Sequence, residues 1–324
     1  TPESIHLRFN QKIMRKGIIF FLPMKLLIFS CKKSNPNYQK DLADANFIHG
    51  IMEKYTDIIV HDIFSPPVAS RNYTDASIAA YEAARHADST YRSLEGQIRD
   101  LKGVPQPDKN KKYSFELAAI KAMILTCKKY IFSEADLMAY EAEVMKEIEK
   151  INVPQEVYKN SMEYGEAVAN HIMAWSDKDN YKESRSFPKF SIDLDEVARW
   201  RTTPPAYMDA VEPHWNEMRT LVTDSAQQFK PIPATPFDTL RNSRFMKEVM
   251  EVYEVGKNLT EEQKAIADFW DCNPYKMNIT GHVMHATKKI SPGGHWINIA
   301  TQVLKTTKAD FVKYNEDPVH NKLT

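Results

Sequence analysis

Histidine is the residue type whose spacing in this chain comes nearest to a catalytic or metal-binding pattern. His282 and His285 form a His-x-x-His pair, and His295 follows Ser291-Pro-Gly-Gly294. Imidazole can ligate zinc or exchange protons near neutral pH. Nearby glycines and a proline disfavour a helix there, and no carboxylate or cysteine stands at a characteristic offset, so we favour solvated or core histidines over a metal site. His295 remains the candidate catalytic histidine, although structural packing against Trp296 is the preferred interpretation.

Cysteine offers a second kind of chemistry. Met14 is followed by a basic pair, an apolar stretch and a small residue directly before Cys31, which is the order found in a bacterial lipoprotein signal. We therefore expect residues 14–31 to be a signal peptide, with cleavage before Cys31 and a lipid anchor on that residue. Residues 1–13 would then be upstream translation. The protein would be exported, as a cell-envelope lipoprotein facing the periplasm or the surface of a bacterium. The alternative is a buried N-terminal helix with an ordinary cysteine.

The remaining thiols and carboxylates carry weaker signals. Cys127 and Cys272 could pair in an oxidising compartment, although two separate buried thiols are at least an equal expectation. Candidate acids are predicted to lie on solvated faces, and the nucleophile-elbow pattern Gly-x-Ser-x-Gly is absent. These acids are Glu82, Asp88, Asp193, Asp195 and Glu196.

Composition excludes several classes of protein. The 324 residues carry 43 basic and 43 acidic side chains, so no net charge draws the chain to nucleic acid. Only 9 glycines argue against hairpin-dense β folds, and the two glycine-rich nucleotide-binding motifs are absent. Three cysteines cannot form a zinc ribbon. Apolar residues make up 43% of the chain, which is enough for one large buried core.

The elements that must position the candidate residues are predicted to be mostly helices, because apolar residues recur at helical spacing. Residues 36–313 are predicted to form a single helical domain, with helices over 36–175 and again over 241–313. Residues 176–240 hold 7 of the 18 prolines, interleaved with aromatic residues. Proline disrupts helices and aromatic side chains favour burial, so this stretch is predicted to be an irregular excursion wrapped over the helices. Residues 314–324 are expected to be an aberrant tail.

Capping residues mark several predicted helix starts. Ser114 is expected to cap one helix, and Ser133 with Asp136 to cap the next. Thr260-Glu-Glu-Gln263 has the pattern of a capping box. Residues 62–68 interrupt the helical pattern with a proline pair.

Several local motifs follow one another along the chain. They are Arg71-Asn72-Tyr73, Ala79-Ala80-Tyr81-Glu82-Ala83, Trp200-Arg-Thr-Thr-Pro-Pro-Ala-Tyr207, Pro213-His-Trp215, Ile266-Ala-Asp-Phe-Trp270 and Pro292-Gly-Gly-His-Trp296. In this order and spacing they resemble the superfamily of vanadium-dependent haloperoxidases and type 2 phosphatidic acid phosphatases, in particular its bacterial secreted branch. The resemblance implies an all-α multi-helix bundle that binds phosphate or vanadate.

In that superfamily, later motifs build the oxyanion site. They are a lysine with an Arg-Pro pair, then Pro-Ser-Gly-His, then Ser-Arg followed by histidine. The cationic side chains neutralise the oxyanion, and the histidines act as nucleophile or ligand and as acid or base. This chain has neither Arg-Pro nor Pro-Ser-Gly-His, and its last arginine is Arg244. His295 lies in an earlier, noncatalytic block of the family order, and only His320 follows it.

We therefore expect a truncated or frameshifted member, altered near residue 313, in which the catalytic motifs are absent. For the full-length relative the resemblance implies vanadate as cofactor and small-molecule substrates, either a phosphate ester or a halide with peroxide. No cofactor is expected for this chain. The alternative is a noncatalytic helical lipoprotein of the cell envelope that binds a partner or ligand.

The charge balance, the lipoprotein signal and the family resemblance together determine which partners we expect. No nucleic acid is expected, membrane contact would run only through the lipid anchor, and a homodimer is compatible with the sequence. Residues 32–324 are expected to be poorly soluble or oligomeric, because apolar helix faces would stay uncovered.

Overall fold

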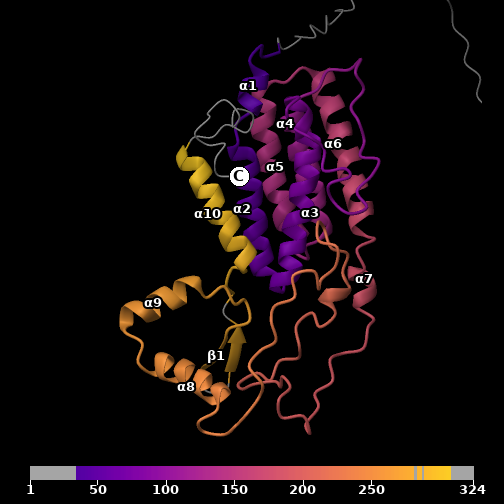
Figure 1. Ribbon diagram of the computed structural model, residues 1–324. Coiled ribbons are helices and arrows are strands. Elements are labelled where there is room, and N and C mark those ends of the chain that lie inside the picture. The colour runs from indigo at the N-terminus through magenta and orange to yellow at the C-terminus, as the bar shows by residue number, and fades with distance from the viewer. Residues whose placement is uncertain (1–33, 281–282, 287, 308–324) are drawn as a thin grey trace, which may run out of the picture. The chain divides into compact units, whose positions relative to one another are not determined.

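Helices make up most of the ordered structure. The computed structural model describes residues 34–280, 283–286 and 288–307 of the chain (Figure 1). Its elements, in chain order, are α1 (Tyr38–Leu42), α2 (Asn46–His61), α3 (Pro66–Ala84), η1 (Arg85–Ala87), α4 (Phe115–Lys129), α5 (Glu134–Ile151), α6 (Gln155–Ser176), α7 (Tyr181–Ser184), η2 (Trp215–Glu217), α8 (Arg244–Lys257), α9 (Glu261–Trp270), β1 (Met277–Thr280), β2 (Val283–Ala286) and α10 (Pro292–Thr307). The predicted all-α class is confirmed, with one short hairpin added.

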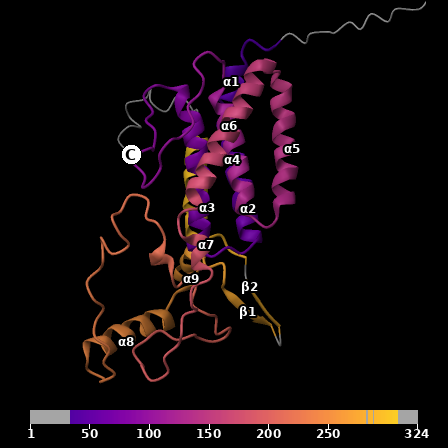
Figure 2. The ribbon, with the colours of Figure 1, turned by 90° about the vertical axis from the view of Figure 1, so that its right-hand side faces the viewer.

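α3, α4 and α6 pack most extensively against one another, and α4 also contacts α2 and α5 (Figures 1 and 2). α10 contacts α2 and α3. Small side chains allow the close packing: Ala76 and Ala79 of α3 are completely buried. At the contact of α4 with α6, a Cβ on Gly165 would lie only 2.3 Å from the carbonyl oxygen of Ala118. Small residues at these positions therefore let the helices approach closely around a core that also holds large side chains such as Ile120 and Met123.

Glu82 lies in this core, so its predicted place on a solvated face is wrong. Its side chain is completely buried near the end of α3. The carboxylate accepts hydrogen bonds from Arg85 Nε at 2.8 Å, Ser93 Oγ at 3.0 Å and the Leu94 amide at 2.5 Å. A buried carboxylate is tolerated when it is paired and hydrogen-bonded in this way. Glu82 thereby ties the loop after α3 to the bundle.

Two predicted helix caps are confirmed. Ser114 Oγ accepts a hydrogen bond from the Leu117 amide at the start of α4. Thr260 and Gln263 form the reciprocal capping box at the start of α9. Such caps satisfy amide groups that the helix itself leaves without partners.

The start of α5 differs from the prediction, because Ser133 does not cap it with its side chain. Its hydroxyl donates to Asp62 Oδ1 at 2.5 Å, and Asp62 Oδ2 accepts from the amides of Phe132 and Ser133. Burial opposes ionisation of Asp62, but these hydrogen bonds outweigh it and lower the pKa of Asp62. A contact distant in sequence therefore holds this helix end.

The predicted break over residues 62–68 is shorter in the structure. α3 begins at Pro66, so the proline pair opens the helix. Proline suits the first helical turn, because the amide hydrogen that it lacks would have no partner within the helix.

Residues 185–243 contain no α-helix, as the prolines predict, but the expected burial of their aromatic side chains is wrong. Trp200, Tyr207 and Phe229 are 51%, 60% and 79% exposed. Phe190 packs against Trp200 with ring centroids 5.6 Å apart. These rings pair locally or face solvent, while a short part of the excursion docks on the bundle.

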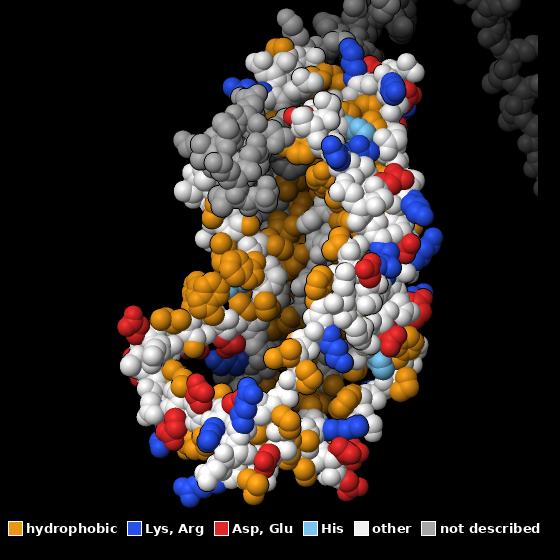
Figure 3. Space-filling model, viewed as in Figure 1, with side chains coloured by type: hydrophobic (Ala, Val, Ile, Leu, Met, Phe, Trp, Pro, Cys, Tyr) orange, Lys and Arg blue, Asp and Glu red, His pale blue; other side chains and the backbone are white. Residues whose placement is uncertain are grey.

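The C-terminal elements leave more of their side chains exposed to solvent than the helices of the bundle do. α8 and α9 contain no buried residue. β1 and β2 form an antiparallel hairpin that pairs Met277 with Ala286, which the sequence analysis did not predict. Figure 3 shows hydrophobic side chains grouped on the surface around α9 and α10, where Trp270 and Trp296 are half-exposed or more.

Both described cysteines are free thiols: Cys127 is buried and Cys272 is partly exposed. No pairing occurs between them, as one of the two expectations held. Within the described residues, no helix has the length and hydropathy of a membrane span. Cys31, the predicted signal peptide and the predicted tail 314–324 lie outside the described residues.

Candidate functional site

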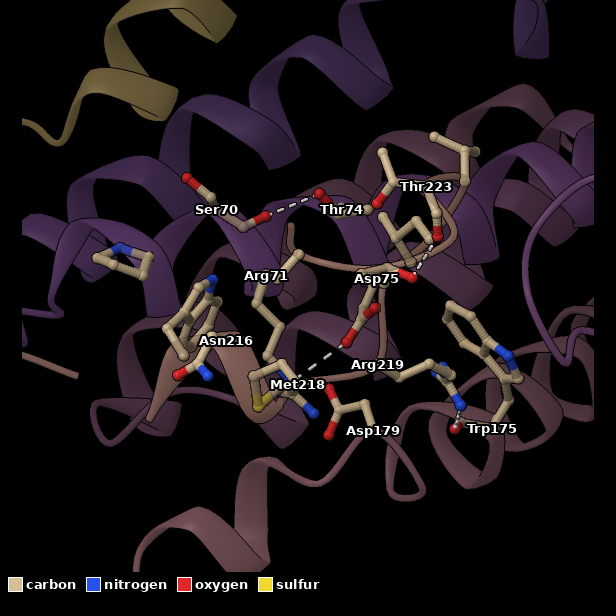
Figure 4. Close-up of a pocket in the computed structure, with 16 residues that line it drawn as sticks. Ser70, Arg71, Thr74, Asp75, Trp175, Asp179, Asn216, Met218, Arg219 and Thr223 are labelled. Atoms are coloured by element: carbon tan, nitrogen blue, oxygen red, sulfur yellow. Dashed lines mark hydrogen bonds and ion pairs between the residues drawn. The ribbon is translucent and has the colours of Figure 1, made fainter. Parts of the chain in front are cut away.

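A pocket of about 780 Å³ lies beside α3 and the C-terminal end of α6 (Figure 4). α3 contributes polar side chains that include Arg71 and Asp75, and Asp179 follows α6. The excursion closes the pocket with residues 215–226. We call it the charged pocket, because two arginines and two aspartates meet there.

Arg71 is the centre of the charged pocket. Its Nε donates to Asp179 Oδ2 at 2.5 Å, its Nη2 donates to Ser176 Oγ at 2.8 Å, and its Nη1 lies 3.9 Å from Asp75 Oδ2. The guanidinium also stacks over Tyr181, 4.6 Å from the ring centroid. Burial alone would lower the pKa of Arg71, but the carboxylate partners raise it overall. Arg71 is thus a permanent cation whose charge is already matched.

Asp75 is the most buried acid of the pocket. Ser176 Oγ donates to Asp75 Oδ2 at 2.6 Å and accepts from the Tyr130 hydroxyl at 2.8 Å. Burial raises the pKa of Asp75, while Ser176 and Arg71 act in the opposite direction. The network joins α3, α6 and Tyr130, the residue after α4, through pairs that are 101 and 46 residues apart in the sequence.

Arg219 enters the pocket from the excursion. Its Nη1 donates to the Trp175 carbonyl at 3.0 Å, and its guanidinium lies 4.0 Å from the centroid of the Trp175 ring. The backbone amide of Arg219 donates to the Asp179 carbonyl at 2.9 Å. Arg219 Nε is buried without a hydrogen-bond partner, and burial lowers the pKa of this arginine. Arg219 therefore keeps some donor capacity for a ligand.

The charged pocket does not match the requirements of a phosphate or vanadate cradle. An oxyanion needs converging donors without competing anions. Here Asp75 and Asp179 face the same space as Arg71, and no histidine lines the pocket. The described residues therefore do not fit vanadate at this pocket.

His295, the candidate catalytic histidine, lies in a different pocket of about 460 Å³ near the end of α9. Its ring stacks on Trp270 with centroids 5.1 Å apart and planes 17° apart. Its Nδ1 lies 3.0 Å from Cys272 Sγ. The expected packing partner was Trp296, but the structure places Trp270 against the imidazole, and Trp296 contacts Trp270 instead.

The other predicted site residues are not brought together. His282 and the side chain of His285 lie outside the described residues, and the described part of the chain holds no cluster of three or more metal-ligating side chains. Asp195 and Glu196 are exposed, as predicted. Asp88 and Asp193 are partly exposed and line neither pocket described above.

Sequence reasoning missed the network around Arg71. The spacing of Arg71 and Asp75, four residues apart on one helix face, was a usable signal. Nothing local could have indicated that Asp179 and Arg219 complete the network, because they join it from other elements. The contact of Cys272 with His295 was missed for the same reason.

Comparison with solved structures relates the chain to a protein of known activity. No family model and no curated protein matches the chain. Among solved structures, the chain is similar to the first bacterial vanadium-dependent iodoperoxidase, with 41% sequence identity and a TM-score of 0.75. The match covers 83% of this chain and 63% of that protein, so the chain spans less than two thirds of its relative. The shared fold and sequence confirm the predicted resemblance to the superfamily of vanadium-dependent haloperoxidases and type 2 phosphatidic acid phosphatases.

Proposed function

We propose that the described residues of this chain form the helical scaffold of an enzyme that, in its full-length relative, oxidises halide with peroxide on bound vanadate. The observation that carries this proposal is the 41% identity to a vanadium-dependent iodoperoxidase over 83% of the chain. Phosphate monoester hydrolysis is the related activity within the same superfamily. The relative's name favours halide oxidation, so we take that as the first candidate.

The scaffold role is supported by the partners of the arginines and of His295, which leave no group of them free to bind vanadate together. Vanadate would need guanidinium and ammonium groups with a histidine at one point. Arg71 is engaged by two carboxylates, Arg219 by a carbonyl and a tryptophan ring, and His295 lies in a separate pocket beside Cys272. In this proposal, the vanadate-binding groups correspond to the portion of the relative that this chain does not span.

A second candidate is a noncatalytic ligand-binding protein of the cell envelope. The charged pocket favours it, because Arg219 Nε has no hydrogen-bond partner there. In either case we propose a lipid anchor on Cys31. Palmitate labelling of the wild-type protein and its absence in Cys31→Ser would support the anchor, and equal labelling would refute it.

Vanadate titration tests the scaffold role. The full chain, followed by calorimetry, should show no saturable binding of vanadate or orthophosphate, and should not oxidise iodide when peroxide is added. The iodoperoxidase itself is the positive control. Saturable binding that Arg71→Ala removes, and that the exposed Arg199→Ala leaves intact, would instead make the charged pocket an oxyanion site.

A chimera tests the haloperoxidase assignment. This chain would be joined to the portion of the iodoperoxidase that it does not span. We expect the chimera to bind vanadate and to oxidise iodide, while this chain alone does neither. A chimera that unfolds cooperatively yet binds no vanadate would contradict the assignment and favour the ligand-binding alternative.

A further inference from the structure

Cys272 and His295 lie in contact although they belong to different elements. Cys272 follows α9, and His295 lies in the first turn of α10. The distance from Cys272 Sγ to His295 Nδ1 is 3.0 Å, which is within the range of a hydrogen bond to sulfur. A thiol next to an imidazole is the pairing used by cysteine nucleophiles, because the imidazole can accept the thiol proton.

The imidazole is held in place on several sides. Its ring stacks on Trp270 and meets the edge of Phe269 at 5.2 Å. The backbone amide of His295 donates to the Ser291 carbonyl at 2.9 Å, which starts the helix. A base oriented by a third group is the further element of a nucleophile site.

The thiol can be reached from solvent. Cys272 and His295 line the pocket of about 460 Å³, together with Pro66 at the start of α3 and residues at the end of α9 and the start of α10. Cys272 is partly exposed, whereas Cys127 is completely buried in the bundle. The chain thus contains an accessible thiol and a matched inaccessible one.

Cys272 needs a base to become a nucleophile, because its thiol is protonated near neutral pH. Burial and the nearby Asp271 carboxylate raise the pKa of Cys272, and Lys289 counteracts them in part. Lys289 is itself bound to Asp271, with 2.9 Å between Nζ and Oδ2. The thiol therefore keeps its proton near neutral pH, and only the thiolate is a strong nucleophile.

We propose that Cys272 is a nucleophilic thiol that reacts with hydrogen peroxide, with His295 Nδ1 as its general base. Nδ1 takes the proton from the thiol while Sγ attacks one peroxide oxygen. The O–O bond breaks, and the leaving oxygen receives the proton from the imidazolium to depart as water. Sulfur is oxidised to a sulfenic acid, peroxide is reduced, and the imidazole is regenerated.

Peroxide oxidation of the full chain tests this site. The chain is treated with hydrogen peroxide at neutral pH in the presence of dimedone, which traps sulfenic acids, and labelled peptides are identified by mass. We expect labelling at Cys272 and none at Cys127. His295→Gln should slow labelling of Cys272 on the order of 100-fold, as expected for loss of a positioned base.

Two references make the result decisive. His214→Gln removes another partly buried histidine, which contacts the Pro188 carbonyl, and should leave the rate at Cys272 unchanged. A free peptide of residues 266–277 carries the same thiol without His295. The proposal is overturned if Cys272 in the wild-type chain reacts no faster than the peptide, or if His295→Gln reacts as fast as the wild type. The peptide comparison does not depend on the folding of any variant.

Discussion

Arg71 illustrates how a single side chain can join distant parts of this protein. Its guanidinium binds Asp179 and Ser176, stacks over Tyr181, and lies near Asp75. Buried charges of this kind are expensive to strip of water and depend on partners with good geometry. The charged pocket is therefore a balanced cluster, and changes in the protonation of one member should be visible in stability.

The stability difference between the wild-type protein and Asp75→Asn should depend on pH. Because burial raises the pKa of Asp75 above 3.8 in the folded state, the folded chain binds this proton more tightly than the unfolded chain. The contribution of Asp75 to the free energy of unfolding therefore rises as pH falls through its folded-state pKa. It levels off below about 3.8, the unfolded value.

Urea unfolding of both proteins, from neutral pH down to about pH 4, measures this difference. We expect the wild type to gain stability relative to Asp75→Asn as the solution becomes more acidic. A difference that stays constant, or that moves the other way, would mean that burial does not dominate at Asp75.

Among the elements, α4 and α6 show how packing can override helix propensity. Gly165 lies within α6, where glycine is an unfavourable helix residue. Its lack of a side chain lets the Ala118 carbonyl of α4 approach to within 2.3 Å of where a Cβ would stand. Gly256 lies in α8 with nothing within 4 Å of its corresponding position. Substitution of Gly165 therefore tests close packing, whereas substitution of Gly256 tests helix propensity alone.

Gly165→Ala and Gly256→Ala should have opposite consequences. Gly165→Ala should lower the free energy of unfolding by about 1–3 kcal/mol, because the backbone of α4 has to move. Gly256→Ala should leave it unchanged or raise it by up to about 1 kcal/mol, through better helix propensity. Urea unfolding of each variant gives both values. Equal effects on stability would refute the close contact of α4 with α6.

In the molecule as a whole, apolar side chains are buried to very different extents in the bundle and in α8 and α9. The bundle buries many of its large apolar side chains and packs others partly against its core, whereas α8 and α9 bury none. Val252 and Val255 of α8 are 74% and 60% exposed, and Phe269 of α9 is 63% exposed. Exposed apolar side chains promote association when they gather in patches.

Self-association of the chain should therefore depend on concentration and on α8. Replacing Val252→Lys together with Val255→Glu should weaken association at least about tenfold, because two apolar contacts are lost. Met138→Lys removes an exposed apolar side chain of α5, away from α8 in the sequence, and is the control, with no effect expected. Analytical ultracentrifugation over a range of concentrations measures both. A wild-type chain that stays monomeric throughout would contradict this expectation.

Local interactions explain which features could be predicted from the sequence. Helices α2 to α6 follow from apolar residues at helical spacing, and the caps at Ser114 and Thr260 from bonds that span three residues. The absence of helix over residues 185–243 follows from proline chemistry, which acts at each position alone. The resemblance to the superfamily could be recognised because the motifs that carry it are short contiguous strings of residues.

The tertiary structure decided everything that joins separate segments. Burial of Glu82, the pairing of Ser133 with Asp62, and the contact of Cys272 with His295 all connect residues from different elements. Arg71 finds Asp179 across 108 positions of the chain. Such contacts depend on the path of the whole backbone, and the free energy that selects this path is shared among many residues. For that physical reason, neither the charged pocket nor the thiol–imidazole pair could be read from local spacing.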